Sequence, residues 1–512
     1  MQSSAESQMN SESQKPSMAQ NSAPKGFLRH LLSFSYPKML VLLFVLSLPI
    51  VNPWLHGDGG GYYAYVHSLL FDHDLQFEDE WRAGNTSFVM SRVDPNGVVA
   101  ASEYTTTHHI GNNFAVGASL LWAPFLIVVH VAILTLNHLG ANITADGFSR
   151  PYLLTMALST AGYGFLGLLL SFRLTRLYTS EKWAFLATVG YWFASSLPVY
   201  MYLNPSWSHA HSLFSVALFL WYWHRTRGSR TWRQWVVIGL LAALMGNVYY
   251  PNLILLLVPG CEAVVDYAAA LKGPLTSDNG AARLFGRHLL SAIVFAIGML
   301  PTLITRKIIY GGFFISGYAG ASTWHWTHPV FGSVLFSSNH GLLSWTPILV
   351  LAVLGIAMFW RFDRSFAFYL WAACLTFYYV IASYVDWHGM SSFGNRFFVS
   401  LGSIFIIGLA VFFERVSRAW KNQRTAFMSL ALAVFLFVAW NLAFIFQWGD
   451  HLIPVRGPIS WRTMTYNQFC VVPREAWGSA RAYLFSRNRF LHKIEQRDIQ
   501  EIQKENPTNP NP

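Results

Sequence analysis

Long apolar runs recur along this chain and are separated by short polar segments. Each run has about 20 residues, the length that a helix needs to cross a bilayer. Hydrocarbon offers no partner to a free backbone N–H or C=O group, so each run is predicted to be an α-helix. The pattern predicts an all-α polytopic membrane protein with about 11 spans. The expected spans are 39–55, 151–172, 183–203, 208–224, 234–250, 252–270, 288–305, 342–360, 365–384, 397–413 and 425–446.

Basic residues gather in the short segments between these runs, as Arg173 with Arg176 and Arg415 with Arg418 do. Cytoplasmic segments of membrane proteins carry an excess of Lys and Arg, so these segments are expected to face the cytoplasm. The N-terminus then lies on the same side. The net charge of +11 is therefore explained by topology and does not indicate a nucleic-acid partner.

One apolar run conflicts with this alternation. If 114–136 crossed the membrane, the cluster of Arg173 and Arg176 would lie outside, against the charge rule. We therefore predict that this run does not cross and that it belongs to one long external segment, 56–150, which carries interfacial helices.

The polar ends of the chain set the domain boundaries. Residues 1–36 are rich in Ser, Gln, Asn and Pro and are predicted to form a disordered cytoplasmic tail. Residues 37–447 form the transmembrane domain, whose first span has no convincing cleavage site and is read as an uncleaved anchor. Residues 448–512 are expected to form an external tail with an amphipathic helix near 474–497.

Asp58 is the most informative residue of the external segments. It lies in the turn His56-Gly57-Asp58-Gly59-Gly60-Gly61, directly after the first apolar run. A carboxylate at this position can meet both a lipid-carried and a soluble substrate. The alternative is that Asp58 only caps a helix or a turn, a role that the neighbouring glycines favour.

Further candidates for substrate binding come from the same external segments, where aromatic rings, amides and isolated charges suit sugar and phosphate recognition. They are Tyr62, Tyr63, Asp72, Asp74, His209, Arg306, Lys307, Asn339, His340, Asp386, Trp387, Asn395 and Arg396.

Each of these candidates also has a structural explanation. Arg396 can neutralise a phosphate through paired donors, or it can snorkel to the lipid headgroups as an anchor. Arg306 and Lys307 compete with Arg396 for the phosphate. Asp72 and Asp74 are typical of caps or solvated loop acids.

Cofactor motifs are missing from the sequence. No Walker loop is present, which disfavours an ATP-driven pump. The external histidines show no metal-ligand signature, so no metal site is predicted, although a requirement for a divalent cation stays open.

Several motifs together resemble a known superfamily. Asp58 after the first span, the following Tyr62-Tyr63-Ala64-Tyr65, Phe71-Asp72-His73-Asp74-Leu75, Leu335 to Leu343 and Phe393-Gly394-Asn395-Arg396 are similar to GT-C-type integral-membrane glycosyltransferases. This superfamily includes the protein O-mannosyltransferases and the aminoarabinose transferases. The resemblance covers roughly residues 35 to 450. The second acid of the Asp-Glu pair in aminoarabinose transferases is Gly59 here.

The resemblance implies a donor sugar linked to polyprenyl phosphate and transfer on the outer face of the membrane. It also implies Asp58 as general base, because an acceptor hydroxyl must lose its proton as it attacks the anomeric carbon. A single inverting displacement is expected. The acceptor is a glycan, a lipid or a protein of the cell envelope, and the expected location is a bacterial inner membrane with a periplasmic site.

Two alternatives remain at this point. A transporter or flippase of lipid-linked sugars would carry charges along a path through the membrane, and the apolar runs here contain few. A polymerase or ligase of surface polysaccharide would use the same kind of donor with another acceptor.

Overall fold

The computed structural model describes residues 35–505, apart from 91, 95, 273–279, 316 and 318–322. The predicted disordered tail, 1–36, lies almost wholly outside these residues. The described chain folds into helices, and its only β-pairing consists of isolated bridges such as Val93 with Val99. The all-α prediction is confirmed.

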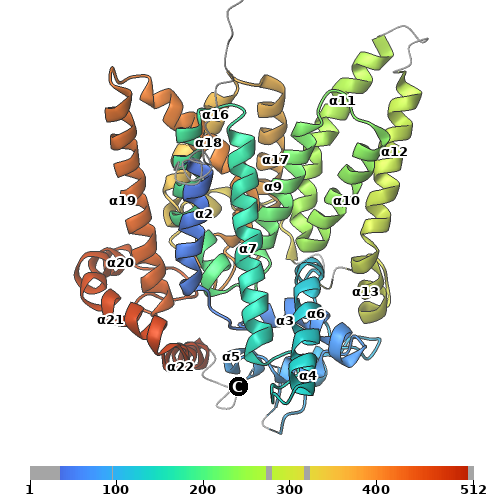
Figure 1. Cartoon of the computed structure of the whole chain (residues 1–512), viewed down its shortest axis with the longest axis vertical. Coiled ribbons are helices and arrows are strands. Elements are labelled where there is room, and N and C mark those ends of the chain that lie inside the picture. Colours follow the sequence, from blue (N-terminus) through green and yellow to red (C-terminus); the bar gives the residue numbers. More distant parts are fainter. Residues whose placement is uncertain are drawn as a thin grey trace, which may run out of the picture.

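The long helices form a bundle, and helices from the early and the late part of the chain form a cap at one end of it (Figure 1). The helices up to residue 310 are α2 (Tyr36–Ser47), α3 (Gly59–His67), α4 (Glu78–Arg82), α5 (Thr86–Val89), α6 (Gly117–His138), α7 (Arg150–Thr175), α8 (Glu181–Phe193), α9 (His209–Arg225), α10 (Trp232–Val248), α11 (Leu257–Lys272), α12 (Ala281–Gly298) and α13 (Leu300–Tyr310). The second half contains α14 (Phe331–Phe336), α15 (Leu342–Trp345), α16 (Ile348–Phe359), α17 (Arg364–Ser383), α18 (Gly402–Ser417), α19 (Gln423–Gly449), α20 (Trp461–Tyr466), α21 (Val472–Phe485) and α22 (Arg487–Glu505).

The core of the bundle lies around α18. The apolar stretch of the helical segment Arg396–Ser417, which ends with α18, is 89% buried, far more than in the other long apolar segments. Glycines allow α18 to approach α16 at backbone distance, because a Cβ on Gly355 would lie 1.7 Å from the carbonyl oxygen of Gly408. A larger residue at either position would push the two helices apart.

Seven of the described helical segments are long and apolar enough to cross a membrane, by length and composition. Other expected spans are helical but shorter or interrupted. The run 183–203 breaks after Phe193 and resumes as a π-helical turn, Val199–Leu203. The run 288–305 breaks between α12 and α13, where Pro301 lies in the first turn of α13. The integral-membrane character is supported, and the number of about 11 spans stays a prediction.

The run predicted not to cross forms α6. Trp122 of α6 donates to Thr160 and His130 contacts Tyr152, so α6 runs antiparallel to the first half of α7. The segments before and after α6 both return to α3: Asn112 donates to the Gly61 carbonyl, and Tyr63 donates to the Gly147 carbonyl. Length and composition would allow α6 to span a membrane, so its non-crossing stays a prediction.

The C-terminal tail packs onto the same end of the molecule as α3 to α6 (Figure 1). Tyr483 of α21 donates to the Ile50 carbonyl, and Arg487 donates to the carbonyls of Pro49 and Val51. The expected helix near 474–497 is thus a pair of helices, α21 and α22, docked on the end of the first apolar segment.

Candidate active site

A cavity of about 780 Å³ opens at the capped end of the bundle. Its polar part includes His56, Asp58 and Arg396, and its far wall is formed by side chains of α21 and α22 such as Tyr483 and Asp498. The cavity therefore joins the first turn after α2, the segment before α18 and the C-terminal tail.

Asp58 lies in the turn that begins α3. Gly57 has a left-handed φ of +52°, a conformation that favours glycine, and the Gly57 amide donates to Asn85 Oδ1 at 3.0 Å. The Asp58 carbonyl accepts from the Tyr62 amide, yet the Asp58 side chain makes no cap bond to the backbone. The carboxylate is instead directed to Arg396, which argues against the capping role.

Asp58 and Arg396 form an ion pair with 2.6 Å between Oδ2 and Nη1. The Asp58 side chain is 32% exposed and the Arg396 side chain 13%, so the pair lines the cavity without being sealed off. The Arg396 guanidinium also lies over the Trp207 ring, 4.5 Å from its centroid. Asp58 and Arg396 are 338 positions apart in the chain.

Buried aromatic side chains back this pair. Tyr200 contacts both Trp207 and His209, and His209 also contacts Tyr249. Burial and the negative charge of Asp58 raise the pKa of Tyr62, so the phenol stays neutral. These rings pack behind Trp207 and hold it in place under Arg396. Tyr62 and His209, two of the predicted substrate-binding residues, therefore support the ion pair but do not line the cavity.

A second arginine, Arg92, also lines the cavity. Burial lowers its pKa, while Glu103 and Asp58 act in the opposite direction, which places Arg92 within electrostatic reach of Asp58. The sequence gives no signal for Arg92, because the loop around it contains both acidic and basic residues.

Apolar side chains form part of the cavity lining. They come from the end of the first apolar segment, the bend after α8, the end of α19 and α21. The apolar lining residues include Ile50, Phe193, Leu203, Ile445, Phe446 and Leu484. The cavity thus combines these apolar side chains, here called its apolar limb, with charged side chains that include Asp58 and Arg396.

Arg306 and Lys307, the other candidates for the phosphate, do not line the cavity. The Arg306 guanidinium donates to the carbonyls of Asn112, Asn113 and Phe114 and to the Tyr250 hydroxyl, at 2.6–2.9 Å. Lys307 donates to the Gly311 carbonyl at 2.7 Å. Both cations are engaged in holding the chain.

The acids of the segment after α3 have local partners. Asp74 accepts from the Ser68 hydroxyl and the Gln76 amide, and Asp72 lies 3.2 Å from His67 Nδ1. Tyr63 is buried and donates to the Gly147 carbonyl. These contacts fit the structural explanation, and none of these three side chains lines the cavity.

The remaining candidates lie behind the cavity wall. Asn395 donates to the Trp387 carbonyl and holds the loop that contains Gly389, and Asp386 accepts from Tyr384. Burial lowers the pKa of His340 to about 3, so its imidazole is neutral; it packs on Trp345. Asn339 adjoins it and donates its amide to Ser337. The structure therefore brings together Asp58 and Arg396 and leaves the others as support.

Two described groups have the composition of a metal site: His56 with Glu495 and Asp498, and His67 with Asp72 and Glu80. In each group the possible ligand atoms lie within 4.8 Å of one another. His67 donates through Nε2 to the Asp146 carbonyl, and the neighbouring carboxylates raise its pKa against the opposing effect of burial. The contacts of His67 with Asp72 and Glu80 are thus explained by ion pairs, without a metal ion.

No protein-family model and no curated protein matches the chain. Among solved structures, the chain is similar to the oligosaccharyltransferase AglB from the archaeon Archaeoglobus fulgidus, in complex with an inhibitory peptide and a dolichol-phosphate. The match covers 84% of this chain and 59% of that chain, with a TM-score of 0.43 and 14% identity.

The chain spans less than two thirds of the neighbour's length, and at this TM-score the likeness transfers no site, donor or acceptor. The case for those rests on the residues of the cavity.

Proposed function

We propose that this chain is a membrane glycosyltransferase that moves a sugar from a polyprenyl-phosphate-linked donor to an acceptor of the cell envelope. The acceptor is a glycan, a lipid or a protein, and Asp58 acts as general base. The observation that carries the proposal is that the Asp58–Arg396 pair lines a cavity whose lining also contains several large apolar side chains.

The cavity suits a donor with two chemically different ends. A polyprenyl chain would lie along the apolar limb, where burial of each CH₂ group contributes about 0.8 kcal/mol. Its phosphate would reach the Arg396 guanidinium, whose planar donors match phosphate oxygens. The sugar would then stand beside Asp58.

The same geometry gives Asp58 a defined role in transfer. The acceptor hydroxyl attacks the anomeric carbon and gives its proton to the Asp58 carboxylate. The bond between that carbon and the phosphate oxygen breaks, and polyprenyl phosphate leaves with the electron pair. One displacement of this kind inverts the configuration at the anomeric carbon.

The ion pair links donor binding to the base. While Arg396 is bonded to Asp58, the guanidinium occupies one oxygen of the carboxylate. A donor phosphate that takes over the guanidinium would leave Asp58 free to accept a proton. The proposal places this end of the molecule on the periplasmic face of a bacterial inner membrane.

Complementation of a deletion strain tests the proposal. Strains carry the wild-type chain, Asp58→Asn or the control Asp79→Asn, which removes a 70% exposed carboxylate, and membrane levels are matched. Mass spectrometry of envelope lipids and glycans should show a sugar that wild type and control restore and Asp58→Asn does not. Restoration by Asp58→Asn would remove Asp58 from the mechanism, and a mass unchanged by deletion would favour translocation of lipid-linked sugars.

A further inference from the structure

Helix α22 is linked to both residues that precede Asp58, directly to His56 and through Asn85 to Gly57. His56 Nε2 lies 3.3 Å from Asp498 Oδ2. The Gly57 amide donates to Asn85 Oδ1, and the Asn85 amide group donates to both oxygens of Glu495, at 3.0 and 3.1 Å. The C-terminal tail therefore reaches the turn along two separate routes.

Glu495 is the anchor of the second route. It is 9% exposed, and its Oε1 also accepts from the Ser87 amide at 2.6 Å. A carboxylate held by an amide side chain and a backbone N–H fixes the orientation of Asn85, because Asn85 must then direct its oxygen to Gly57. The Gly57 amide, one residue before Asp58, is positioned by a residue more than four hundred positions away.

Asp498 ties the first route to the end of α19. Its Oδ1 lies 3.1 Å from His451 Nε2, while His451 Nδ1 lies 3.0 Å from Glu501. His56 is fixed from the other side as well, because its carbonyl accepts from Trp207 Nε1 at 2.8 Å. His56 is thus held between α22 and the same tryptophan that lies against Arg396.

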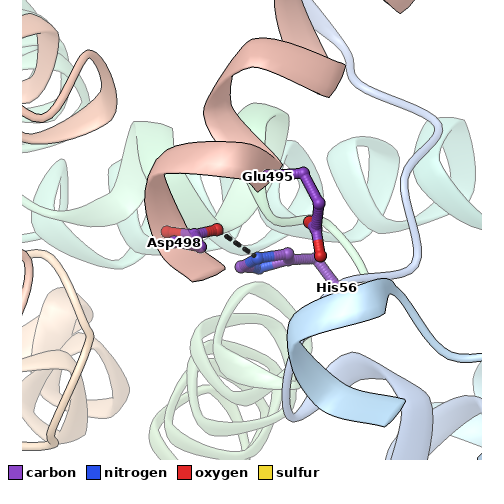
Figure 2. A group of neighbouring side chains, drawn as sticks. All are labelled: His56, Glu495 and Asp498. Atoms are coloured by element: carbon purple, nitrogen blue, oxygen red, sulfur yellow. Dashed lines mark hydrogen bonds and ion pairs between the residues drawn. The ribbon is translucent and has the colours of Figure 1, made fainter. Parts of the chain in front are cut away.

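The three side chains are near enough to suggest a metal site, yet their arrangement is that of a hydrogen-bond network. Figure 2 shows the imidazole of His56 between the carboxylate ends of Asp498 and Glu495, with its bond to Asp498. Both oxygens of Glu495 already accept hydrogen bonds, and Asp498 is shared by two histidines. The contacts serve to hold the turn.

We propose that Glu495 and Asp498 are positioning residues that hold the Asp58 turn in its working geometry, so that α22 is an integral part of the active site. This inference rests on the proposed function of Asp58. A base displaced by about 1 Å can lose up to a hundredfold in rate, so an effect on turnover is expected even from Glu495, which does not line the cavity.

Conservative variants of the purified full-length chain test the inference. In Glu495→Gln, the new side-chain NH2 group would face the NH2 group of Asn85, and two donors repel each other. Asn85 is then expected to turn, so that its oxygen no longer accepts from the Gly57 amide. Asp498→Asn weakens the link to His56. The matched control is Glu475→Gln, which makes the same change at an exposed position of α21. We expect turnover about tenfold lower in both variants, with a nearly unchanged KM for the donor, and no change in the control.

A double-variant cycle separates positioning from general structural damage. If α22 acts through Asp58, Glu495→Gln should not lower the residual rate of Asp58→Asn any further. An equal loss in both backgrounds, or wild-type turnover in both α22 variants, would overturn the inference. Tight Mn²⁺ binding to the wild-type chain that Glu495→Gln and Asp498→Asn each abolish would also overturn it, in favour of a metal site.

The two proposals fail in distinguishable ways. Full activity of Asp58→Asn would refute the proposed function itself. Loss of activity in Asp58→Asn, together with normal turnover of both α22 variants, would refute only the positioning role. If Glu495→Gln lowers the amount of folded protein, the milder Asp498→Asn carries the test at matched thermal stability.

Discussion

Arg306 and Arg396 are two arginines at the same end of the molecule, and the sequence offers both for the same phosphate. Arg306 is 2% exposed, and its guanidinium is surrounded by three carbonyls and a hydroxyl. Arg396 is bonded to a single carboxylate and lines a cavity. The number and kind of acceptors separates a cation that holds the fold from one that is available for exchange with a ligand.

The partners explain why the two differ. Backbone carbonyls cannot move without unfolding the segment 112–114, so Arg306 has nothing to release. Asp58 is a side chain, 32% exposed, and its bond to Arg396 can be replaced by a bond to a phosphate. An ion pair that can be exchanged costs less to open than one that is sealed.

Alanine substitutions should separate the two arginines most strongly. Arg396→Ala should lower transfer by about a hundredfold or more, as removal of a charge-stabilising donor does, with membrane levels near wild type. Arg306→Ala should instead destabilise the fold by about 3 kcal/mol or more, because buried carbonyls lose their donors. Transfer assays and thermal unfolding in detergent, run on both variants, measure the contrast.

The comparison would be broken by the opposite pattern. If Arg306→Ala were stable and inactive while Arg396→Ala were active, the phosphate would bind at the clamp on 112–114 and not in the cavity. Equal loss of folded protein in both variants would show that the Asp58–Arg396 pair is structural.

Lysine at position 396 sharpens the role of the guanidinium. Arg396→Lys keeps the positive charge but loses the planar pair of donors and the stacking on Trp207, so transfer should fall about tenfold. The control Lys307→Arg changes a cation outside the cavity and should leave the rate unchanged. Wild-type transfer by Arg396→Lys would mean that charge alone suffices.

Trp207 should contribute less. Trp207→Phe keeps a ring under Arg396 but loses the hydrogen bond to the His56 carbonyl, worth about 1 kcal/mol, or roughly a fivefold fall in rate. Trp387→Phe serves as the control, since Trp387 does not line the cavity. Steady-state transfer rates check both, and a larger loss in Trp387→Phe would contradict the geometry.

The contacts of His451 with Asp498 and Glu501 predict that the docking of α22 weakens as the pH rises from about 6.5 to about 9. Hydrogen bonds to Asp498 and Glu501 raise the pKa of His451 to about 9, against the opposing effect of burial. The stabilisation of α22 is therefore fully present below the unfolded-state pKa of about 6.5 and is lost as the pH rises through about 9. His56, Asp450 and Arg497 adjoin the network.

Limited proteolysis of the tail between pH 7 and 10 measures this docking. Cleavage near α22 should increase as the pH rises from 7 towards about 9 and then level off, and His451→Gln should remove the pH dependence. Protection that does not change over this range would contradict the role of His451.

The sequence singled out the ion pair of the candidate site but not its surroundings. Asp58 stands out because a carboxylate follows an apolar run within a glycine-rich turn, and Arg396 because it follows a polar element before another run. The clamp on Arg306 has no such signal, since backbone carbonyls carry no side-chain identity. Glu495 and Asp498 were equally hidden, because polar residues of an amphipathic tail helix look solvated until the helix is docked.

The helical class was predictable for a similar physical reason, because apolar length is encoded locally. Interruptions were not: the break after Phe193 and the short lengths of α9 and α10 depend on how neighbouring helices pack. The apolar limb of the cavity also depends on this packing, since it joins residues from four separate segments.

The most direct test of the central claim measures binding and turnover together in purified Asp58→Asn. If Asp58 is the base and its partner Arg396 receives the phosphate, turnover should fall at least about a hundredfold. Affinity for polyprenyl phosphate should stay the same or rise, because the guanidinium is no longer neutralised. Turnover within about twofold of wild type, a difference of only about 0.4 kcal/mol in the barrier, would contradict the account.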